Sequence, residues 1–342
     1  MVEITPYDAL EPSFYESRVN NLFYSARWLA VLQKTYGYHW FTALDTSNEY
    51  FILFTVTDNL AGKKIISLPF SDYTPISANY QESLPAIVSA LREKYPHYQI
   101  ILKTELETDN PIASSLGKPT RHAVYHRIDT STPAQISQSS SFRRGVRKAQ
   151  KAEVTTEIST DEAALRTFYQ MYHQLRFEKF NSIPQPYEFF RNIHQTFIQE
   201  EQGFILQASR QQQVLASIVV LQYQSTLYYK FGCSASDSLA YRPNNLLFHR
   251  LIEIAVERNC HTIDLGLSGT GPSYEGLRRF KESTGGVSHP ITYFTLTPEE
   301  YDERTGNESK TLLKSLTQTI VDQKLSTEVT SQISSIIYPY FA

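Results

Sequence analysis

The chain has 342 residues, a formal net charge of −3, and a composition that is 41% hydrophobic and 20% charged. This length exceeds that of a typical single domain and allows two domains, each with its own core. The small negative charge excludes a globally basic nucleic-acid-binding surface, so any site for a polyanion must be local. The first residues lack the apolar segment of a signal peptide, and no apolar run of transmembrane length follows. We therefore expect a cytoplasmic protein that does not insert into membranes.

The first half of the chain alternates helical and strand-like segments. Ser25 can cap a helix in which Trp28, Leu29 and Leu32 share one face. The expected elements, in chain order, are a helix over 23–36, strands over 40–44, 50–56 and 64–68, a helix over 83–95 and a strand over 98–102. Between the strand over 64–68 and the helix over 83–95 lies a further segment, 69–75. Its bracketing prolines exclude a sheet interior, so we expect a loop at a strand end. This loop is either a surface turn or the border of a ligand cleft.

A basic segment opens the second half, after a linker over 129–141 that is rich in Ser, Thr, Gln and Pro. On a helix, its cations form one stripe at i, i+4 and i+8 with two more beside it. Like charges at this spacing destabilise an isolated helix by a few tenths of a kcal/mol per pair, which a bound anion can offset. A solvated basic face is the alternative. The stripe consists of Arg143, Arg147 and Lys151, and the flanking cations are Arg144 and Lys148.

Helices over 161–176 and 187–199 and three strands over 204–209, 214–223 and 227–233 follow. The last strand leads through a loop to a helix that begins at Pro243, and then to a strand over 262–267 with a glycine-rich end. Strand, helix, strand in this order predicts a β-α-β unit in a parallel or mixed sheet, with ligands at the strand ends. Cys233 and Cys260 lie in or beside this unit without metal-ligand spacing, so we expect buried free thiols and no metal.

A short helix over 274–283 carries Gly-Leu-Arg-Arg-Phe-Lys after an Asp-Leu-Gly strand end, and Gly285 and Gly286 stop it. This pattern resembles the Fem family of peptidoglycan-bridge aminoacyltransferases. It is also similar to the FemAB-like and BioF2-like proteins of polysaccharide clusters, all within the GNAT (acyl-CoA N-acyltransferase) superfamily. The resemblance implies an α/β (α+β) protein with two tandem GNAT-like domains, each a mixed central sheet flanked by helices. We expect these domains over 1–130 and 131–298, and a C-terminal helical extension over 299–342.

The resemblance implies an acyltransferase that moves an acyl or aminoacyl group from an activated donor to a primary amine of a cell-envelope or polysaccharide precursor. A lysine-like amine is neutral in only about one part in 2,500 at pH 7, so the site must help to deprotonate it. Asp264, Glu275 and Glu178 are the candidate bases by position, although Asp264 can instead brace the turn after its strand. Lys281 matches the family's Phe-Lys lysine, which implies contact with the donor or the developing charge. Tyr229 can donate a hydrogen bond or protonate the leaving group, or fill the core.

In Fem-like proteins the basic run is associated with the phosphate-bearing substrate, which assigns the cations of the 143–151 segment to substrate binding. Phe280, which precedes Lys281 in the Phe-Lys pair, and Tyr274 are further candidates for substrate binding, and Tyr274, like Tyr229, can donate a hydrogen bond or instead fill the core. Tyr73 joins them, because the 69–75 loop is similar to the Leu-Pro-x-x-x-Tyr loop of FemAB-like proteins. The implied acceptor is a phosphate-bearing, amino-sugar or peptide molecule.

The donor is left open between acyl-CoA and aminoacyl-tRNA. Coenzyme A sites usually have a glycine-rich loop after the central strand, whose N–H groups bind the pyrophosphate. Here the loop over 234–243 has no glycine, and Asp237 would oppose phosphate. Two alternatives remain besides the favoured reading: a CoA-dependent small-molecule N-acetyltransferase, and a non-catalytic nucleotide- or glycan-binding module on the same fold.

Overall fold

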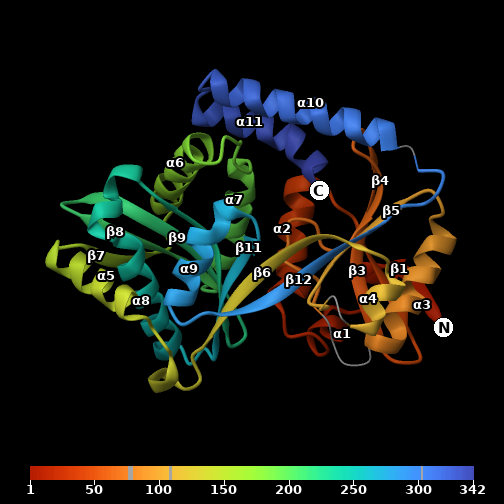
Figure 1. Cartoon of the computed structure of the whole chain (residues 1–342), viewed down its shortest axis with the longest axis horizontal. Coiled ribbons are helices and arrows are strands. Elements are labelled where there is room, and N and C mark those ends of the chain that lie inside the picture. The colour runs from red at the N-terminus through yellow and green to blue at the C-terminus, as the bar shows by residue number, and fades with distance from the viewer. Residues whose placement is uncertain (76–79, 108–109, 302) are drawn as a thin grey trace. The chain divides into compact units, whose positions relative to one another are not determined.

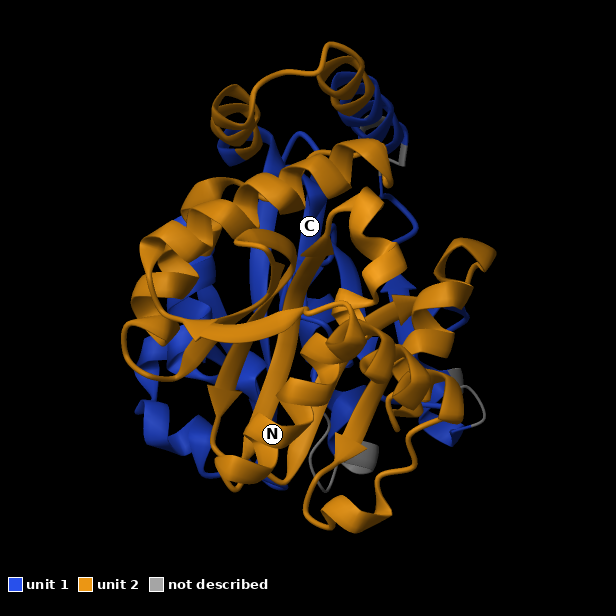
Figure 2. Cartoon of the chain, turned by 90° about the vertical axis from the view of Figure 1, so that its left-hand side faces the viewer, with its two compact units in different colours: residues 1–123, 290–316, 335–342 blue, residues 124–289, 317–334 orange. Residues whose placement is uncertain are grey.

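The computed structural model describes residues 1–75, 80–107, 110–301 and 303–342. The chain forms two compact units, each assembled from separated segments (Figure 2). Unit 1 comprises Met1–Ala123, Pro290–Leu316 and Ser335–Ala342, and unit 2 comprises Val124–His289 and Thr317–Ser334. The boundaries between these units at 123/124 and 289/290 fall inside two strands, β6 (Pro119–Asp129) and β12 (Val287–Leu296), that the sequence did not predict. The predicted domain limits at residues 130 and 298 stay a prediction.

Unit 1 is built on a mixed sheet with the strand order β1-β2-β3-β4-β5-β12 (Figure 1). The β4–β5 pair is parallel, whereas β1–β2, β2–β3, β3–β4 and β5–β12 are antiparallel. Its apolar side chains are buried against the flanking helices, so this sheet carries its own core. The strands are β1 (Val2–Pro6), β2 (Trp40–Asp45), β3 (Tyr50–Asn59), β4 (Gly62–Ile66), β5 (Gln99–Thr104) and β12 (Val287–Leu296).

The helices of unit 1 begin and end at the signals that the sequence carries. The predicted N-cap of α2 is confirmed, because the Ser25 side chain accepts a hydrogen bond from the Trp28 N–H. Gly37, at a φ of 74°, ends this helix in the left-handed conformation that glycine favours. The helices are α1 (Pro12–Glu16), α2 (Ala26–Tyr36), α3 (Tyr80–Lys94) and α4 (Pro111–Ser115).

The strands of unit 2 follow the order β7-β8-β9-β10-β11-β6 and again combine parallel and antiparallel pairs. The strands β7 to β10 form an antiparallel meander, and β10 pairs with β11 in parallel, which confirms the predicted β-α-β unit. The predicted mixture of parallel and antiparallel strands in both halves of the chain is likewise confirmed. The strands are β6 (Pro119–Asp129), β7 (Thr155–Ser159), β8 (Gly203–Arg210), β9 (Gln213–Tyr223), β10 (Thr226–Ser234) and β11 (Thr262–Gly269).

Helices of unit 2 cover this sheet, and α8 is its parallel crossover connection. Helix α5 packs closely on α8, because Gly145 leaves room for Asn245: a Cβ at residue 145 would lie 2.6 Å from the Asn245 Cγ. Ser139 caps α5 by accepting from the Phe142 N–H. The helices are α5 (Ser140–Lys151), α6 (Glu162–Glu178), α7 (Tyr187–Ile193), α8 (Pro243–Glu257) and α9 (Glu275–Ser283).

The C-terminal part of the chain contains two helices, α10 (Glu303–Asp322) and α11 (Thr327–Ile337). Residues 317–334 belong to unit 2 and residues 335–342 to unit 1. Across the described ranges, none of the helices combines the length and apolarity needed to cross a membrane.

Candidate functional site

The strands β10 and β11 of unit 2 separate partway along their length. They pair in parallel only from Thr226 to Tyr228, opposite Thr262 to Asp264. Both strands then continue, β10 to Ser234 and β11 to Gly269. On its other side, β10 shifts register against β9 between Tyr229 and Phe231, which is a β-bulge. A bulge bends a strand and increases its local twist, so it helps to part β10 from β11.

A cavity of about 340 Å³ lies beside this opening. Its walls come from β10, the first turns of α8, the end of α6 and the segment from η6 (Pro272–Tyr274) into α9. Ligands in open α/β sheets bind at such carboxyl ends of parallel strands. The lining residues are Tyr172, Leu175, Arg176, Lys179, Phe180, Ile218, Tyr229, Gly232, Cys233, Ser234, Asn244, Phe248, Ser273, Tyr274, Gly276, Leu277 and Phe280.

Two glycines make room for the tyrosines of this cavity. A Cβ at Gly232 would lie 2.9 Å from Cε2 of Tyr229, so the ring could not keep its place beside a larger residue. A Cβ at Gly269 would lie 2.7 Å from Cδ2 of Tyr274. The backbone of β10 and β11 therefore determines the positions of both rings.

The cavity is cationic and apolar. Arg176 and Lys179 contribute positive charges at the end of α6, and none of the described side chains that line it is a carboxylate. Burial raises the pKa of the Tyr229 hydroxyl and of the Cys233 thiol far above their usual values. Both groups are therefore neutral at pH 7: the tyrosine can donate a hydrogen bond, and the cysteine cannot act as a thiolate nucleophile.

A second cavity of about 330 Å³ lies between α5 and the start of α8, and Phe280 lines both cavities. Three cations line it: Arg144 and Lys148 from α5, and Arg242 immediately before α8. The N-terminus of a helix carries a partial positive charge, which adds to theirs. This arrangement favours an anionic group, such as phosphate, in the second cavity.

The loop between β10 and α8 folds into a 3₁₀ helix over Ser236–Tyr241. Two of its backbone N–H groups form hydrogen bonds within the loop. The Ser238 N–H donates to the Ala235 oxygen at 3.2 Å, and the Arg242 N–H donates to the Leu239 oxygen at 3.2 Å. These N–H groups are therefore not presented to a pyrophosphate, in agreement with the lack of glycine in this loop.

Lys281 lies outside both cavity linings. Its side chain is buried, and Nζ donates to the carbonyl oxygens of Gly266 at 2.8 Å and Leu267 at 3.0 Å. These carbonyls belong to the end of β11, so Lys281 ties α9 to this strand. The predicted contact of Lys281 with the donor or the developing charge stays a prediction, and its side chain is held by the end of β11.

Asp264 is also buried, in β11, and its Oδ1 accepts from the Gly266 N–H at 2.7 Å. Its Oδ2 lies 3.7 Å from Nε of Arg127 in β6. Gly266 has a φ of 70°, so Asp264 holds a left-handed turn of the backbone. This is the bracing role that was the alternative to catalysis.

Of the five predicted cations of α5, the structure brings two to a cavity. Arg144 and Lys148 line the second cavity, whereas Arg143, Arg147 and Lys151 are exposed outside it. The i, i+4 pair that contacts the cavity is thus the flanking pair rather than the predicted stripe.

The three predicted aromatic residues lie in different surroundings. Phe280 lines both cavities, and Tyr274 lines the first at its exposed edge. Tyr73 is fully buried in unit 1, where its hydroxyl accepts from Nδ2 of Asn21 at 3.0 Å and its ring packs edge-on against Phe23. Its predicted contact with substrate stays a prediction.

Sequence reasoning missed several lining residues. Arg242, Asn244 and Asn245 surround the start of α8, where the Arg-Pro-Asn-Asn run signalled a helix start without indicating what it faces. Arg176 and Lys179 lie at a helix end that the sequence assigned to an ordinary loop. Both expected free cysteines are indeed buried and unpaired. No group of three or more metal-ligating side chains of the acidic, His or Cys type gathers anywhere in the described residues.

Comparison with protein families places residues 137–282 in the acetyltransferase (GNAT) domain family. This segment contains α5, strands β7 to β11 and all but the last residue of α9, and with them every lining residue of the first cavity and all but Ser283 of the second. The match supports the predicted GNAT-like domain for this segment. None of the curated proteins matches the sequence.

Solved structures share the fold over nearly the whole chain. The structure of FemX superposes with a TM-score of 0.60 and 14% sequence identity, covering 89% of this chain and 97% of FemX. L-PGS from Bacillus licheniformis gives a TM-score of 0.53 at 11% identity, covering 90% of this chain and 95% of that one. The C-terminal domain of a putative lysylphosphatidylglycerol synthetase from Agrobacterium fabrum gives 0.51 at 10% identity, with 85% and 91% covered. The predicted FemAB-like fold is thereby confirmed.

Proposed function

We propose that this protein transfers an acyl or aminoacyl group from an activated donor to a primary amine of a cell-envelope or polysaccharide precursor. The observation that carries the proposal is the pair of cavities in unit 2 that share Phe280. One is an apolar cavity at the parted strands, and the other is lined by three cations. A donor with a phosphate-bearing end and a reactive acyl end fits such a pair.

The phosphate-bearing part of the donor binds Arg144, Lys148 and Arg242 in this proposal. Arginine and lysine form strong charge-assisted hydrogen bonds to phosphate oxygens. An aminoacyl-tRNA fits better than acyl-CoA, since the 3₁₀ loop before α8 uses its own N–H groups. The similarity to a structure entitled putative lysylphosphatidylglycerol synthetase also supports aminoacyl transfer.

The acceptor amine reaches the acyl carbon in the first cavity. Arg176 and Lys179 disfavour the protonated amine by charge repulsion, so they lower its pKa without a carboxylate base. The amine nitrogen then attacks the carbonyl carbon, and the bond from this carbon to the donor oxygen or sulfur breaks. The proton that the amine loses passes to the departing oxygen or sulfur. The neutral Tyr229 hydroxyl donates a hydrogen bond to the carbonyl oxygen as it becomes negative.

Lys281 and Asp264 support this site as positioning residues in our proposal. Lys281 binds two carbonyl oxygens at the end of β11, and Asp264 holds the turn at Gly266. Together they keep β11 apart from β10, which preserves the opening. A direct catalytic role of either residue would require it to face the cavity.

A CoA-dependent N-acetyltransferase is the second candidate, because the family model that matches residues 137–282 is that of an acetyltransferase domain. Thermal unfolding separates the two. A ligand at a hundred times its Kd stabilises a protein by about 2.7 kcal/mol, which is readily measured. We expect stabilisation by charged tRNA and by UDP-linked cell-wall precursors, and transfer of a labelled aminoacyl group between them. Stabilisation by acetyl-CoA alone, together with acetylation of an added amine, would establish the second candidate instead.

A further inference from the structure

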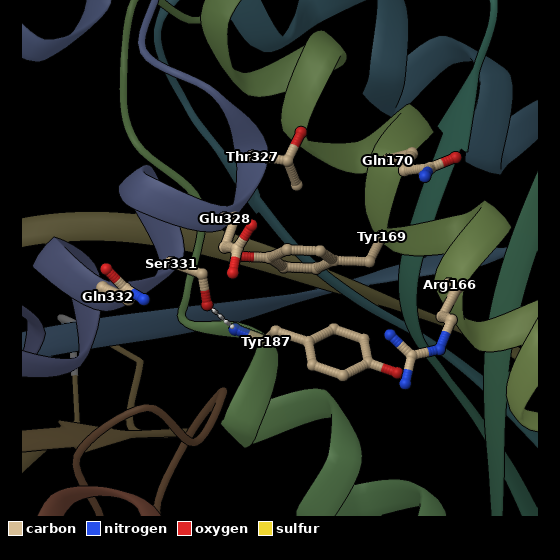
Figure 3. Close-up of a pocket in the computed structure, with 8 residues that line it drawn as sticks. All are labelled: Arg166, Tyr169, Gln170, Tyr187, Thr327, Glu328, Ser331 and Gln332. Atoms are coloured by element: carbon tan, nitrogen blue, oxygen red, sulfur yellow. Dashed lines mark hydrogen bonds between the residues drawn. The ribbon is translucent and has the colours of Figure 1, made fainter.

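A third cavity, of about 520 Å³, lies in unit 2 and shares no lining residue with the other two. Its walls are formed by α6, α7 and α11 (Figure 3). None of the sequence motifs discussed above falls in it, and the proposed transfer reaction does not use it.

Two tyrosine rings form one wall of this cavity. The centroids of Tyr169 and Tyr187 are 5.1 Å apart with an interplanar angle of 64°. The Tyr169 hydroxyl donates to the Gln185 oxygen at 3.0 Å. The Tyr187 N–H donates to Oγ of Ser331 at 2.7 Å (Figure 3). These hydrogen bonds position both tyrosines before a ligand binds. The entropic cost of ordering these side chains on binding is therefore small.

Polar side chains surround the rings. Gln170 on α6 and Gln332 on α11 each present an amide that both donates and accepts, and Glu328 presents a carboxylate that accepts. All three are exposed, so their hydrogen-bonding groups can reach a ligand in the cavity.

The charge of the cavity disfavours anions. The Arg166 guanidinium lies 5.3 Å over the Tyr187 ring and is paired with Glu162 at 2.5 Å, so its charge is already balanced. Glu328 then leaves the cavity slightly negative, which repels phosphate and carboxylate groups.

We propose that this third cavity is a binding site for a neutral saccharide. A sugar has apolar C–H faces that stack on aromatic rings, and hydroxyl groups that both donate and accept hydrogen bonds. The half-buried ring of Tyr187, backed by the buried ring of Tyr169, meets the first requirement, and Gln170, Gln332 and Glu328 meet the second. Glu328 is the one carboxylate among the described lining residues and has no second acid or base beside it there. The cavity therefore binds a saccharide without catalysing a reaction on it.

The test is titration of the full chain with chitotriose, cellotriose and maltotriose up to about 10 mM, by calorimetry and by saturation-transfer NMR. We expect at least one of them to bind, and Tyr187→Ala to weaken its binding roughly tenfold. Gln170→Ala and Gln332→Ala, at exposed positions that leave the wall intact, should weaken binding about threefold each.

Gln174→Ala is the matched control, because Gln174 lies on the same helix and does not line the cavity. It should leave saccharide binding unchanged. The proposal is overturned if none of the three sugars binds. It is equally overturned if a sugar binds as tightly to the Gln170→Ala and Gln332→Ala proteins as to the Gln174→Ala protein.

Discussion

The two units have the same strand order, yet their parallel junctions differ. In each unit four strands form an antiparallel meander, the fourth pairs in parallel with the fifth, and a sixth completes the sheet. The parallel pair is β4–β5 in unit 1 and β10–β11 in unit 2. In unit 1 the chain after β4 stays against β5, and in unit 2 the corresponding strands part around a cavity.

Hydrogen bonds close the junction of unit 1. The Ser67 N–H donates to the Ile101 oxygen at 3.0 Å, and further along the Thr74 N–H donates to the Lys103 oxygen at 2.7 Å. Between them Lys103 Nζ donates to the Ser71 oxygen at 2.5 Å. The 69–75 loop thus fills in unit 1 the place that remains open in unit 2. The same strand order therefore gives a cavity at the parallel junction of unit 2 and a closed, hydrogen-bonded junction in unit 1.

We expect the largest effect of a substitution at Lys281, which holds the end of β11 at the junction between β10 and β11. Lys281→Ala should lower the free energy of unfolding by about 3 kcal/mol, because it leaves two buried carbonyl oxygens without a donor and creates a void. Urea unfolding measures this. Arg279→Ala, at an exposed position on the same helix, should change it by less than about 0.5 kcal/mol. Unchanged stability with lost transfer would instead make Lys281 a catalytic residue.

Filling the open junction should abolish most of the activity. In Gly232→Ala the new Cβ displaces the Tyr229 ring, and we expect kcat/KM for transfer to fall roughly a hundredfold. Gly276→Ala is the matched control, since Gly276 lines the same cavity and its Cβ would meet nothing within 4 Å. Equal activity of the two variants would contradict the placement of the reaction in this cavity.

Acid should loosen unit 2 before unit 1. Among the described residues, the buried histidines all lie in unit 2, and burial lowers the pKa of His126 to about 4. Below pH 6.5 the His126 imidazole is protonated in the unfolded chain, whereas in the folded chain it stays neutral down to about pH 4. The free energy of unfolding therefore falls as the pH falls through this window. We expect a loss of about 2 kcal/mol at pH 5 relative to pH 7.5, measured by denaturant unfolding. His126→Gln should remove most of this dependence and leave the smaller part due to His173, whose pKa burial also lowers. An unchanged slope would assign the dependence to other groups.

We expect the smallest effect from substitutions in the second cavity, which lies at the start of α8 and is lined by three cations. Lys148→Gln and Arg242→Gln should each weaken binding of a phosphate-bearing donor about tenfold, and more at low salt than at high salt. Arg147→Gln changes the same charge on α5 outside the cavity and should have little effect. Equal weakening by all three would mean that only the overall charge of α5 matters.

Local sequence signals predicted much of unit 2. Pro243 marked the start of α8, the glycines after residue 265 marked the end of β11, and Ser25 marked a helix start in unit 1. Strands β6 and β12 escaped prediction because their partners are distant in the sequence, and β12 contains Pro290 and polar residues that weaken its pattern.

The candidate site was predicted only in part, for a related reason. Spacing placed five cations on one helix, but only the packing of α5 on α8 decides that Arg144 and Lys148 face the cavity. Likewise, a Phe-Lys pair on a short helix does not indicate which member is buried, and tertiary contacts bury Lys281.

Strand β12 gives the chain an order of assembly during translation. Unit 1 needs β12 to cover the edge of β5, and β12 is synthesised only after nearly all of unit 2. While the ribosome makes unit 2, the nascent N-terminal segment holds an incomplete sheet whose uncovered strand edge can pair with other chains. Residues 317–334 of unit 2 and residues 335–342 of unit 1 are synthesised later still. Chaperone binding to stalled nascent chains should therefore persist until residue 296 has emerged from the exit tunnel.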